Sequence, residues 1–220
     1  AEDTATGLLG KLKRIKKIKP EIVIAVMGCM VGPTSKDLSR RFPHVDVWAR
    51  PQEFQKILDP VSQTFNNDAS GCAPDLVPAK PNVASYIPII HGCDKFCSFC
   101  IIPYRRGRET SRSILDIFRE TQLLVERGVK EVTLLGQNVD SYGHDLEPQC
   151  DLADLFSSIH NIEGLERIRF LTSHPNDMSL KIIESIRDLP KVCENINLPF
   201  QAGDNDILKG YAKIRDQILI

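Results

Sequence analysis

Three cysteines, Cys93, Cys97 and Cys100, stand within eight residues of the chain. Thiolates this close together in sequence favour a shared metal centre. The spacing supplies three ligands, whereas a closed structural zinc site takes four and an iron-sulfur cluster usually takes four cysteines. A missing fourth ligand predicts an open coordination position on the metal. The alternative is a zinc loop that His91 or a distant cysteine completes.

An open iron of a 4Fe-4S cluster can bind a small molecule directly, and one such arrangement serves S-adenosylmethionine radical chemistry. The aromatic Phe99 directly before Cys100 fits that use. An apolar, strand-like run from Val83 to Ile90 precedes the cysteines, and a helical pattern opens after them at Ser113. The cysteines are therefore expected on a loop at the carboxyl end of a strand, where α/β folds bind ligands.

Beyond this loop the chain alternates between helical and strand patterns. Helices are predicted from Ser113 to a stop at Gly128, after an Asp151 cap, and from Ser179 to Leu189; strands are predicted at 131–135, 167–171 and 195–200. This alternation predicts an α/β fold with a parallel sheet and right-handed crossovers, either open or curved toward a barrel.

The loops after these strands should gather at one edge of the sheet. They are rich in Gly, Asn, Gln, Ser and His, so their polar side chains are candidates to hydrogen-bond a polar cofactor beside the cluster: Gln137, Asn138, Ser173, His174 and Gln201. Ordinary turn chemistry is the alternative for each of them. His174 has a further possible role as a general base, but a His-Pro pair after a strand is equally compatible with a structural role.

A group of arginines follows the cysteine loop beside Tyr104: Arg105, Arg106, Arg108 and Arg112. Arginines next to an aromatic suit phosphate contact and base stacking in RNA. The alternative is that they pair with acids such as Glu109. Six further cations lie between Lys11 and Lys19, and they form either a solvated face or a second phosphate-binding group.

The first part of the chain predicts a smaller α/β unit. Leu8, Leu12, Ile15 and Ile18 recur at helical spacing, and Pro20 ends that helix. The run 21–27 is typical of a buried parallel strand and leads to Cys29, which is either a packed core thiol or a metal ligand. A helix at 35–42 and a strand at 45–48 follow, and prolines then indicate a linker over residues 59–82.

Composition places the chain among ordinary globular proteins. Hydrophobic residues make up 42% and charged residues 26% of the 220, and the formal net charge is -1. The first twenty residues lack the apolar core of a secretory signal, and the apolar run 22–31 is too short to span a bilayer. Seven cysteines, three of them clustered, suit metal binding in a reducing compartment. We therefore expect a cytoplasmic protein with no membrane partner.

Several phrases resemble the radical S-adenosylmethionine methylthiotransferase family. They are Met27-Gly-Cys29, Gly92-Cys-Asp-Lys-Phe-Cys-Ser-Phe-Cys-Ile-Ile-Pro-Tyr104, Arg106-Gly-Arg108, Leu135-Gly-Gln-Asn-Val-Asp-Ser-Tyr-Gly143, Thr172-Ser-His-Pro175 and Leu198-Pro-Phe-Gln-Ala-Gly203. The resemblance implies a partial (βα) radical SAM barrel over 83–220 and, before it, a small Rossmann-like methylthiotransferase domain over 1–58. The phrase from Gly136 to Gly143 is most similar to the MiaB-type branch, which converts isopentenyladenosine in tRNA into its 2-methylthio derivative.

The resemblance also implies a division of labour. Cys93, Cys97 and Cys100 would hold a 4Fe-4S cluster that cleaves S-adenosylmethionine to a 5'-deoxyadenosyl radical, and Cys29 would be one ligand of a second, auxiliary 4Fe-4S cluster that carries the sulfur. The radical would take hydrogen from the adenine ring carbon, where the methylthio group is then inserted. The implied partners are tRNA and an external electron donor, and a monomer is expected. Related branches act on threonylcarbamoyladenosine in tRNA or on a ribosomal-protein aspartate, and a zinc-stabilised RNA-binding module without catalysis is the alternative of a different class.

The chain departs from the family pattern at both ends. No cysteine precedes Cys29, although the family places two more auxiliary-cluster cysteines there, and no RNA-binding β-barrel follows the second domain. From these departures we expect a shortened or discontinuous record of a longer protein. A polypeptide that begins at Ala1 is expected to bind about four irons rather than about eight and to cleave S-adenosylmethionine without inserting sulfur.

Overall fold

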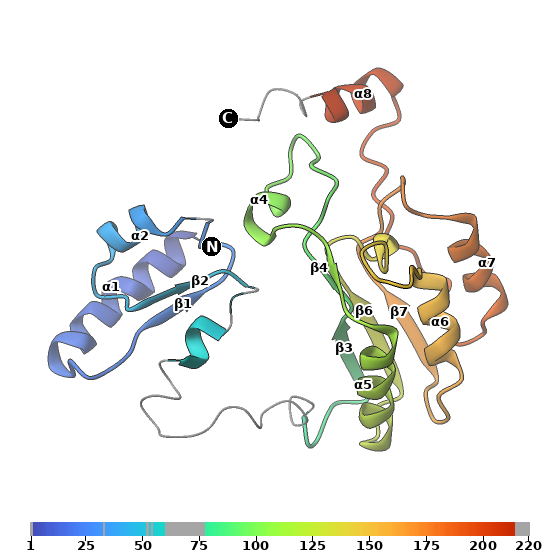
Figure 1. The fold of residues 1–220 in the computed structure, drawn as a ribbon, viewed down its shortest axis with the longest axis horizontal. Helices are drawn as coiled ribbons and strands as arrows, with labels where there is room; N and C mark the ends of the chain where they lie inside the picture. The colour runs from blue at the N-terminus through green and yellow to red at the C-terminus, as the bar shows by residue number, and fades with distance from the viewer. Residues whose placement is uncertain (1, 33, 52, 54, 60–77, 214–220) are drawn as a thin grey trace. The chain divides into compact units, whose positions relative to one another are not determined.

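A computed structural model describes residues 2–32, 34–51, 53, 55–59 and 78–213 (Figure 1). The chain divides into two compact units, residues 1–72 with 104–106 and residues 73–103 with 107–220. Each unit has its own hydrophobic core. The predicted linker lies largely outside the described residues, at 60–77.

The first unit contains α1 (Glu2–Ile18), β1 (Ala25–Met27), α2 (Lys36–Arg41) and β2 (Val47–Ala49), and residues 55–59 form a further helical segment. The two strands pair in parallel, with Val26 opposite Trp48. The predicted order of helix, strand, helix and strand is confirmed. The prediction of a strand buried on both faces is wrong, because Val23, Ala25 and Met27 are exposed while Ile24 is buried.

The covered face of α1 also differs from the prediction. Leu9 is buried and Leu12 is half-buried, whereas Leu8, Ile15 and Ile18 are exposed. Lys16 lies on the covered side of the helix and pairs with Asp46. The sequence offers two overlapping apolar stripes, at 8, 15 and 18 and at 5, 9 and 12, and the first unit packs on the second of them.

The second unit is built on a three-stranded parallel sheet with the strand order β3 (Ala84–Pro88), β6 (Glu131–Leu135) and β7 (Arg167–Phe170). The helices between and after these strands are α5 (Ile114–Glu126), α6 (Leu152–His160) and α7 (Leu180–Asp188). Apolar residues of the strands and helices form one buried cluster: Ile87, Ile117, Leu124, Val132, Leu134, Leu155, Phe156, Ile159, Ile168, Phe170 and Ile182. The predicted α/β alternation with a parallel sheet is confirmed from residue 84 to residue 188.

Local signals fix the boundaries of these helices. The Ser113 hydroxyl accepts a hydrogen bond from Asp116 N at 3.1 Å, and Gly128 follows the end of α5 with a φ of +96°. Asp151 and Asp154 form a reciprocal capping box at the start of α6. Each cap satisfies a backbone N–H that the helix itself leaves without a partner.

The strand predicted over residues 83–90 is interrupted. β3 ends at Pro88, and a separate strand β4 (Ile90–His91) pairs antiparallel with β5 (Thr110–Ser111). This short ribbon closes a neck beneath residues 92–109, which carry the three clustered cysteines and the short helix α4 (Ile102–Arg106). The cysteines therefore lie on a closed loop beyond the carboxyl end of β3.

The strand predicted over residues 195–200 is wrong. The parallel contact of this region with β7 is an isolated bridge between Ile168 and Val192, and the stretch 195–200 is exposed. One hydrogen bond, from Ser173 N to Asn197 O at 3.0 Å, ties the stretch to the loop after β7. Pro199 has no N–H to donate to a ladder, which weakens strand pairing at this point. The chain continues into α8 (Asn205–Lys213).

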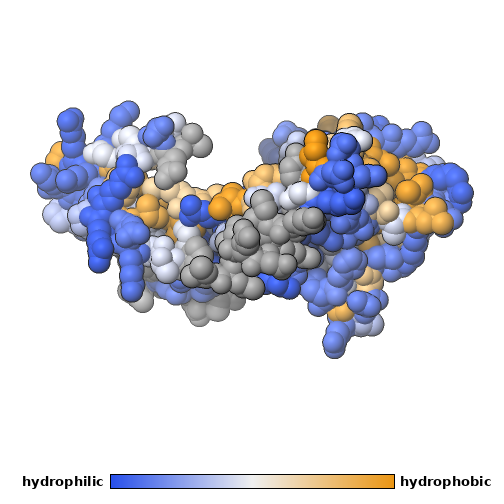
Figure 2. Space-filling model, turned by 90° about the horizontal axis from the view of Figure 1, so that it is seen from above, coloured by the Kyte–Doolittle hydropathy of each residue, from blue (hydrophilic) through white to orange (hydrophobic). Residues whose placement is uncertain are grey.

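Polar and charged residues cover much of the surface in Figure 2, with apolar patches between them. Within the described ranges no helix combines the length and apolar character that a membrane span requires.

Candidate iron-sulfur site

Three loops meet at the carboxyl edge of the second unit's sheet. The cysteine loop receives a contact from the loop after β6, where Gln137 Oε1 accepts a hydrogen bond from Gly92 N at 2.7 Å. It receives two more from the loop after β7: Cys97 Sγ lies 3.8 Å from His174 Nε2, and Lys95 Nζ lies 2.5 Å from Asp177 Oδ1. Parallel strands end at the same edge, so residues 45 and 77 positions apart become neighbours.

The cysteine loop is braced internally by backbone and carboxylate contacts. Asp94 and Glu109 exchange hydrogen bonds between backbone N–H and side-chain carboxylate, at 3.1 and 3.2 Å, across the two ends of the loop. Cys93 N donates to Gly107 O at 3.2 Å, and Cys100 N donates to Cys97 O at 2.9 Å. These bonds connect the two ends of the loop and close a turn between Cys97 and Cys100.

The three thiols differ in exposure. Cys93 is 8% exposed, and burial raises the pKa of its thiol to about 11, with the negative charge of Glu109 acting in the same direction. Cys97 and Cys100 are half-buried. A metal ligand must be a thiolate, so metal binding at Cys93 releases a proton that the buried thiol otherwise retains.

Cys93, Cys97 and Cys100 lie on one loop of the second unit, and a cluster places a different demand on their spacing than a single ion does. Among the residues that the structure describes, no three His, Cys, Asp or Glu side chains converge on one metal-ion position. A zinc ion needs its thiolates at about 2.3 Å from a single centre. A 4Fe-4S cluster places each cysteine on a different iron, so its ligands stay apart from one another.

Asn138 provides a second observation that fits a bound polar group. Its side chain is 2% exposed, and its Nδ2 donates to Asp177 Oδ2 at 2.6 Å. Its Oδ1 is buried and has no hydrogen-bond partner in the structure. A buried amide oxygen without a partner is costly, and an N–H of a ligand at this edge would remove that cost.

Two carboxylates organise these loops, the buried Asp140 and Asp177, whose side chain is 8% exposed, and the sequence predicts a role for neither. Asp140 accepts hydrogen bonds from the Ser173 hydroxyl at 3.1 Å and from His174 N at 2.9 Å. Burial raises the pKa of Asp140 to about 6, although both of these hydrogen bonds oppose the shift. Asp140 lies between Gly136 and Gly143, and it is the one acidic residue among the amides and glycines of that loop. Its position there is a sequence feature from which a role could have been predicted. Asp177 carries no local signal.

His174 lies between these carboxylates and Cys97. Burial lowers the pKa of His174, and the nearby Lys95 adds to that effect, while the negative charges of Asp177 and Glu109 oppose it. The neutral imidazole is therefore the favoured form next to the cysteine loop. Its Nδ1 accepts a hydrogen bond from Asn176 N at 3.2 Å, which leaves Nε2 directed toward Cys97.

Three other residues predicted to bind the cofactor differ in their exposure: Ser173, Phe99 and Gln201. Ser173 is buried, and its hydroxyl donates a hydrogen bond to Asp140 Oδ1 at 3.1 Å. Phe99 is exposed on the cysteine loop, and Gln201 is exposed at a φ of +66° in the stretch without strand structure.

The predicted arginine group divides between loop and helix. Arg105 and Arg106 end α4. Arg108 pairs with Asp94 at 2.9 Å and lies over the Phe96 ring at 5.9 Å from its centroid, yet its side chain remains largely exposed. Arg112 donates to Pro88 O at 2.9 Å and pairs with Glu120 at 2.6 Å. Pairing with acids, the alternative to RNA contact, thus applies to Arg108 and Arg112, while the exposed side of Arg108 stays accessible to a phosphate.

The isolated cysteines separate into two kinds. Cys29 is exposed in the turn that follows β1, so its interpretation as a packed core thiol is wrong. An exposed thiol beyond a strand's carboxyl end is accessible to a metal. Cys150 and Cys193 are half-buried free thiols, and Cys72 lies outside the described residues.

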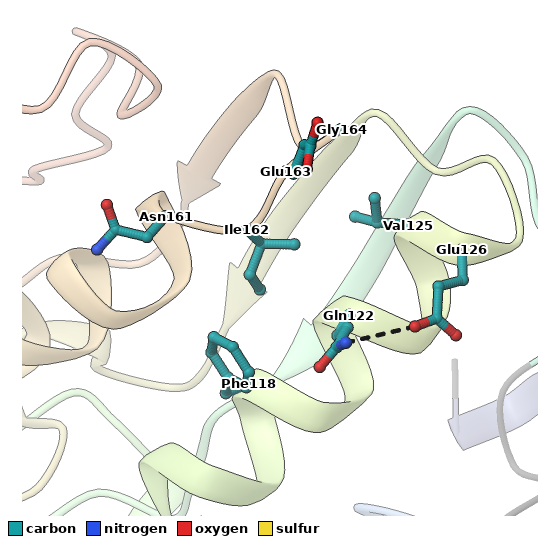
Figure 3. Close-up of a pocket in the computed structure, with 8 residues that line it drawn as sticks. All are labelled: Phe118, Gln122, Val125, Glu126, Asn161, Ile162, Glu163 and Gly164. Carbon is teal, nitrogen blue, oxygen red and sulfur yellow. Dashed lines mark hydrogen bonds between the residues drawn. The ribbon is translucent and has the colours of Figure 1, made fainter.

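A surface hollow lies apart from this site, between α5 and the turn that joins α6 to β7 (Figure 3). Phe118 and Val125 line its α5 side, and residues 161–164 line the other. Gln122 Nε2 donates to Glu126 Oε1 at 3.4 Å along its rim. Because residues 161–164 come just before β7, the hollow opens at the amino end of the sheet, opposite the cysteine loop.

The chain is similar to curated proteins that carry the name tRNA-2-methylthio-N(6)-dimethylallyladenosine synthase. It is 44% identical over 221 aligned positions to the protein of Desulfitobacterium hafniense (strain Y51), a match that covers 96% of this chain and 49% of that protein. It is 45% identical over 208 positions to that of Dehalococcoides mccartyi (strain ATCC BAA-2100 / JCM 16839 / KCTC 5957 / BAV1), with 94% and 47% covered. The chain thus spans about half the length of the curated relatives it matches.

Among solved structures, the chain resembles the radical S-adenosylmethionine methyltransferase TsrM from Kitasatospora setae with a TM-score of 0.47 and 17% identity, over 58% of this chain and 24% of that one. A family model matches the second unit as well. Residues 87–217 match the model described as the Radical SAM superfamily, and this range is more than half of the chain. With Cys93, Cys97 and Cys100 inside the matched range, this chain belongs to the radical SAM superfamily.

Proposed function

We propose that this chain acts in a tRNA-modifying methylthiotransferase, which inserts a methylthio group at the adenine ring carbon of isopentenyladenosine next to the anticodon. The observation that carries the proposal is the similarity of 94–96% of the chain, at 44–45% identity, to proteins named for that reaction. In this proposal residues 1–58 belong to a methylthiotransferase domain, 59–82 form a linker, and 83–220 belong to a radical SAM domain with a partial (βα) barrel.

Cys93, Cys97 and Cys100 would hold the 4Fe-4S cluster in this assignment. When bound, a cluster with an open iron supplies the electron that cleaves S-adenosylmethionine. The residues of the chain do the positioning. Gln137 accepts a hydrogen bond from the backbone of Gly92, directly before the first cysteine. Asn138 Oδ1 is a buried acceptor that an N–H of S-adenosylmethionine would satisfy.

Cys29 would contribute to an auxiliary cluster, because it is an exposed thiol at the carboxyl end of β1. The exposed part of Arg108 and the cations at the end of α4 would contact tRNA phosphates. Such contacts weaken as salt rises, since phosphate neutralisation releases counterions.

The reaction is tested on nucleosides from cells that lack the gene for this chain. Their tRNA hydrolysate is expected to lose 2-methylthio-isopentenyladenosine, and the restored gene is expected to recover it. A gene with Cys97→Ala should fail to restore the nucleoside, whereas Cys193→Ala should restore it, because Cys193 is a free thiol away from the cysteine loop. Unchanged tRNA beside an unmodified ribosomal-protein aspartate would assign the protein to the other branch.

The cofactor assignment is tested on the purified chain. After anaerobic reconstitution it should be brown and, with dithionite, release 5'-deoxyadenosine from S-adenosylmethionine. Cys97→Ala is expected to lose nearly all of the iron bound at this loop. A colourless protein that contains one zinc ion would instead support the RNA-binding module without catalysis.

A further inference from the structure

Lys95 stands between Cys93 and Cys97 and reaches out of the cysteine loop to a carboxylate on a different loop. Its Nζ lies 2.5 Å from Asp177 Oδ1, and the second oxygen of Asp177 accepts a hydrogen bond from Asn138 Nδ2 at 2.6 Å. The Asp177 carboxylate therefore joins the cysteine loop, the loop after β6 and the loop after β7.

The burial of this pair distinguishes it from the surface pairs of the same unit. The side chain of Asp177 is 8% exposed and that of Lys95 is 25% exposed. Removing one partner of a part-buried pair leaves the other charge with less compensation from water than at the surface, which costs more than breaking an exposed pair. Lys181, which is 54% exposed and contacts Asp151 and Asp154, provides an exposed pair for comparison.

The position of the pair along the loop suggests what it does. The β4–β5 neck and the Asp94–Glu109 hydrogen bonds fix the two ends of the cysteine loop. Lys95 fixes the segment between the first two cysteines to the edge of the sheet. The pair also places the positive charge of Lys95 between Cys93 and Cys97 in the sequence, and the negative charge of Asp177 balances it.

We propose that Asp177 and Lys95 are positioning residues, which hold the cysteine loop against the sheet edge and balance the charge beside the iron-sulfur site. The proposal rests on the proposed function in one respect, since the cluster on this loop comes from there. Reduction potentials of iron-sulfur clusters depend on nearby net charge and hydrogen bonds. Loss of the Asp177 charge should therefore favour the reduced cluster, and loss of the Lys95 charge should favour the oxidised one.

The first test uses the iron-free chain and is independent of the cofactor. Asp177→Asn and Lys95→Gln are each expected to raise the unfolding equilibrium constant about tenfold or more, measured by urea denaturation. The double variant should cost clearly less than the product of the two single effects, because both remove the same interaction. Lys181→Gln is the matched control and should change the constant about twofold or less. Independent, multiplicative effects of the two substitutions would overturn the proposal.

The second test measures the midpoint potential of the reconstituted chain by a redox titration followed by electron paramagnetic resonance. Asp177→Asn should shift the potential upward and Lys95→Gln should shift it downward, whereas Lys95→Arg, which keeps the charge, should match the unmodified chain. A purely structural role predicts shifts of the same sign for both, and that result would also overturn the proposal. If Asp177→Asn does not fold, Lys95→Gln against Lys95→Arg still decides the sign.

The two proposals fail in different ways. If the unmodified chain binds no cluster, or if Cys97→Ala keeps all its iron, the proposed function fails, while the unfolding measurements on the iron-free chain still decide whether the two residues are coupled. If the cluster forms normally and the coupling is absent, the positioning role alone is wrong.

Discussion

Gly92 shows how a single backbone position shapes the candidate site. It directly precedes Cys93 and has a φ of +80°, a region that L-amino acids with a side chain rarely adopt. A Cβ placed there would lie 2.0 Å from Arg108 O, on the opposite side of the loop's neck. The two ends of the cysteine loop can therefore approach this closely only around a glycine.

At this residue we predict that Gly92→Ala is more destabilising than Gly128→Ala, a matched substitution at a φ of +96° with nothing within 4 Å of the new Cβ. Gly128→Ala should lower the free energy of unfolding by about 1–2 kcal/mol through backbone strain alone. Gly92→Ala should cost roughly 1–3 kcal/mol more, because the methyl group overlaps backbone atoms that cannot move aside. Urea denaturation of the iron-free chain measures both, and equal costs would contradict the described neck geometry.

At the scale of the element, α6 packs against β7, the strand that leads into the loop carrying Ser173 and His174. Its capping box fixes where the helix begins, and its buried face includes Leu152, Leu155, Phe156 and Ile159. Phe156 lies 5.3 Å from the Phe170 ring of β7, measured between centroids. Because β7 leads directly to Ser173 and His174, the packing of α6 determines where that loop starts.

We predict that Phe156→Ala lowers the free energy of unfolding by about 3–5 kcal/mol, since it opens a cavity beneath β7. Phe200→Ala is the control: this residue has the same side chain but is 73% exposed, so its cost should stay within about 0.5 kcal/mol. Denaturation followed by circular dichroism compares the two. A similar small cost for both would mean that Phe156 is not packed as described.

At the scale of the whole molecule, the chain carries two separate hydrophobic cores. The first is built around residues such as Leu9, Ile24 and Trp48, and the second around the parallel sheet and its helices. Trp48 is the one tryptophan of the sequence and lies in the first core. Its fluorescence therefore reports on the first unit alone, whereas far-ultraviolet circular dichroism reports on both.

We predict that these two probes follow different unfolding curves in urea, because two cores of different size do not unfold as one cooperative transition. Phe156→Ala should move the main dichroism transition and leave the midpoint of Trp48 fluorescence unchanged. Coincident curves, or a fluorescence midpoint that follows Phe156→Ala, would show that the two units unfold together.

The sequence alone determined those features that depend on neighbouring residues. The cysteine spacing placed three candidate metal ligands on one loop, and the alternation of helices and strands from residue 113 to residue 189 followed from caps, glycine stops and periodicity. These signals are local, because a Ser113 cap or a Gly128 stop acts within one helical turn. The loops that line the candidate site could also be predicted, because the carboxyl ends of parallel strands meet at one edge of a sheet.

Only the tertiary structure decided which of several equally apolar residues are buried in a core and which polar residues form contacts between loops. The buried face of α1 depends on what packs against it, and the split of the predicted strand at Pro88 depends on β5, about twenty residues further along the chain. Asp140 and Asp177 gained their roles from burial beside loops distant in sequence, and no short-range pattern records such a contact. The stretch 195–200 has an apolar character typical of a strand, yet pairing requires a neighbour in register, and that requirement is a property of the folded chain.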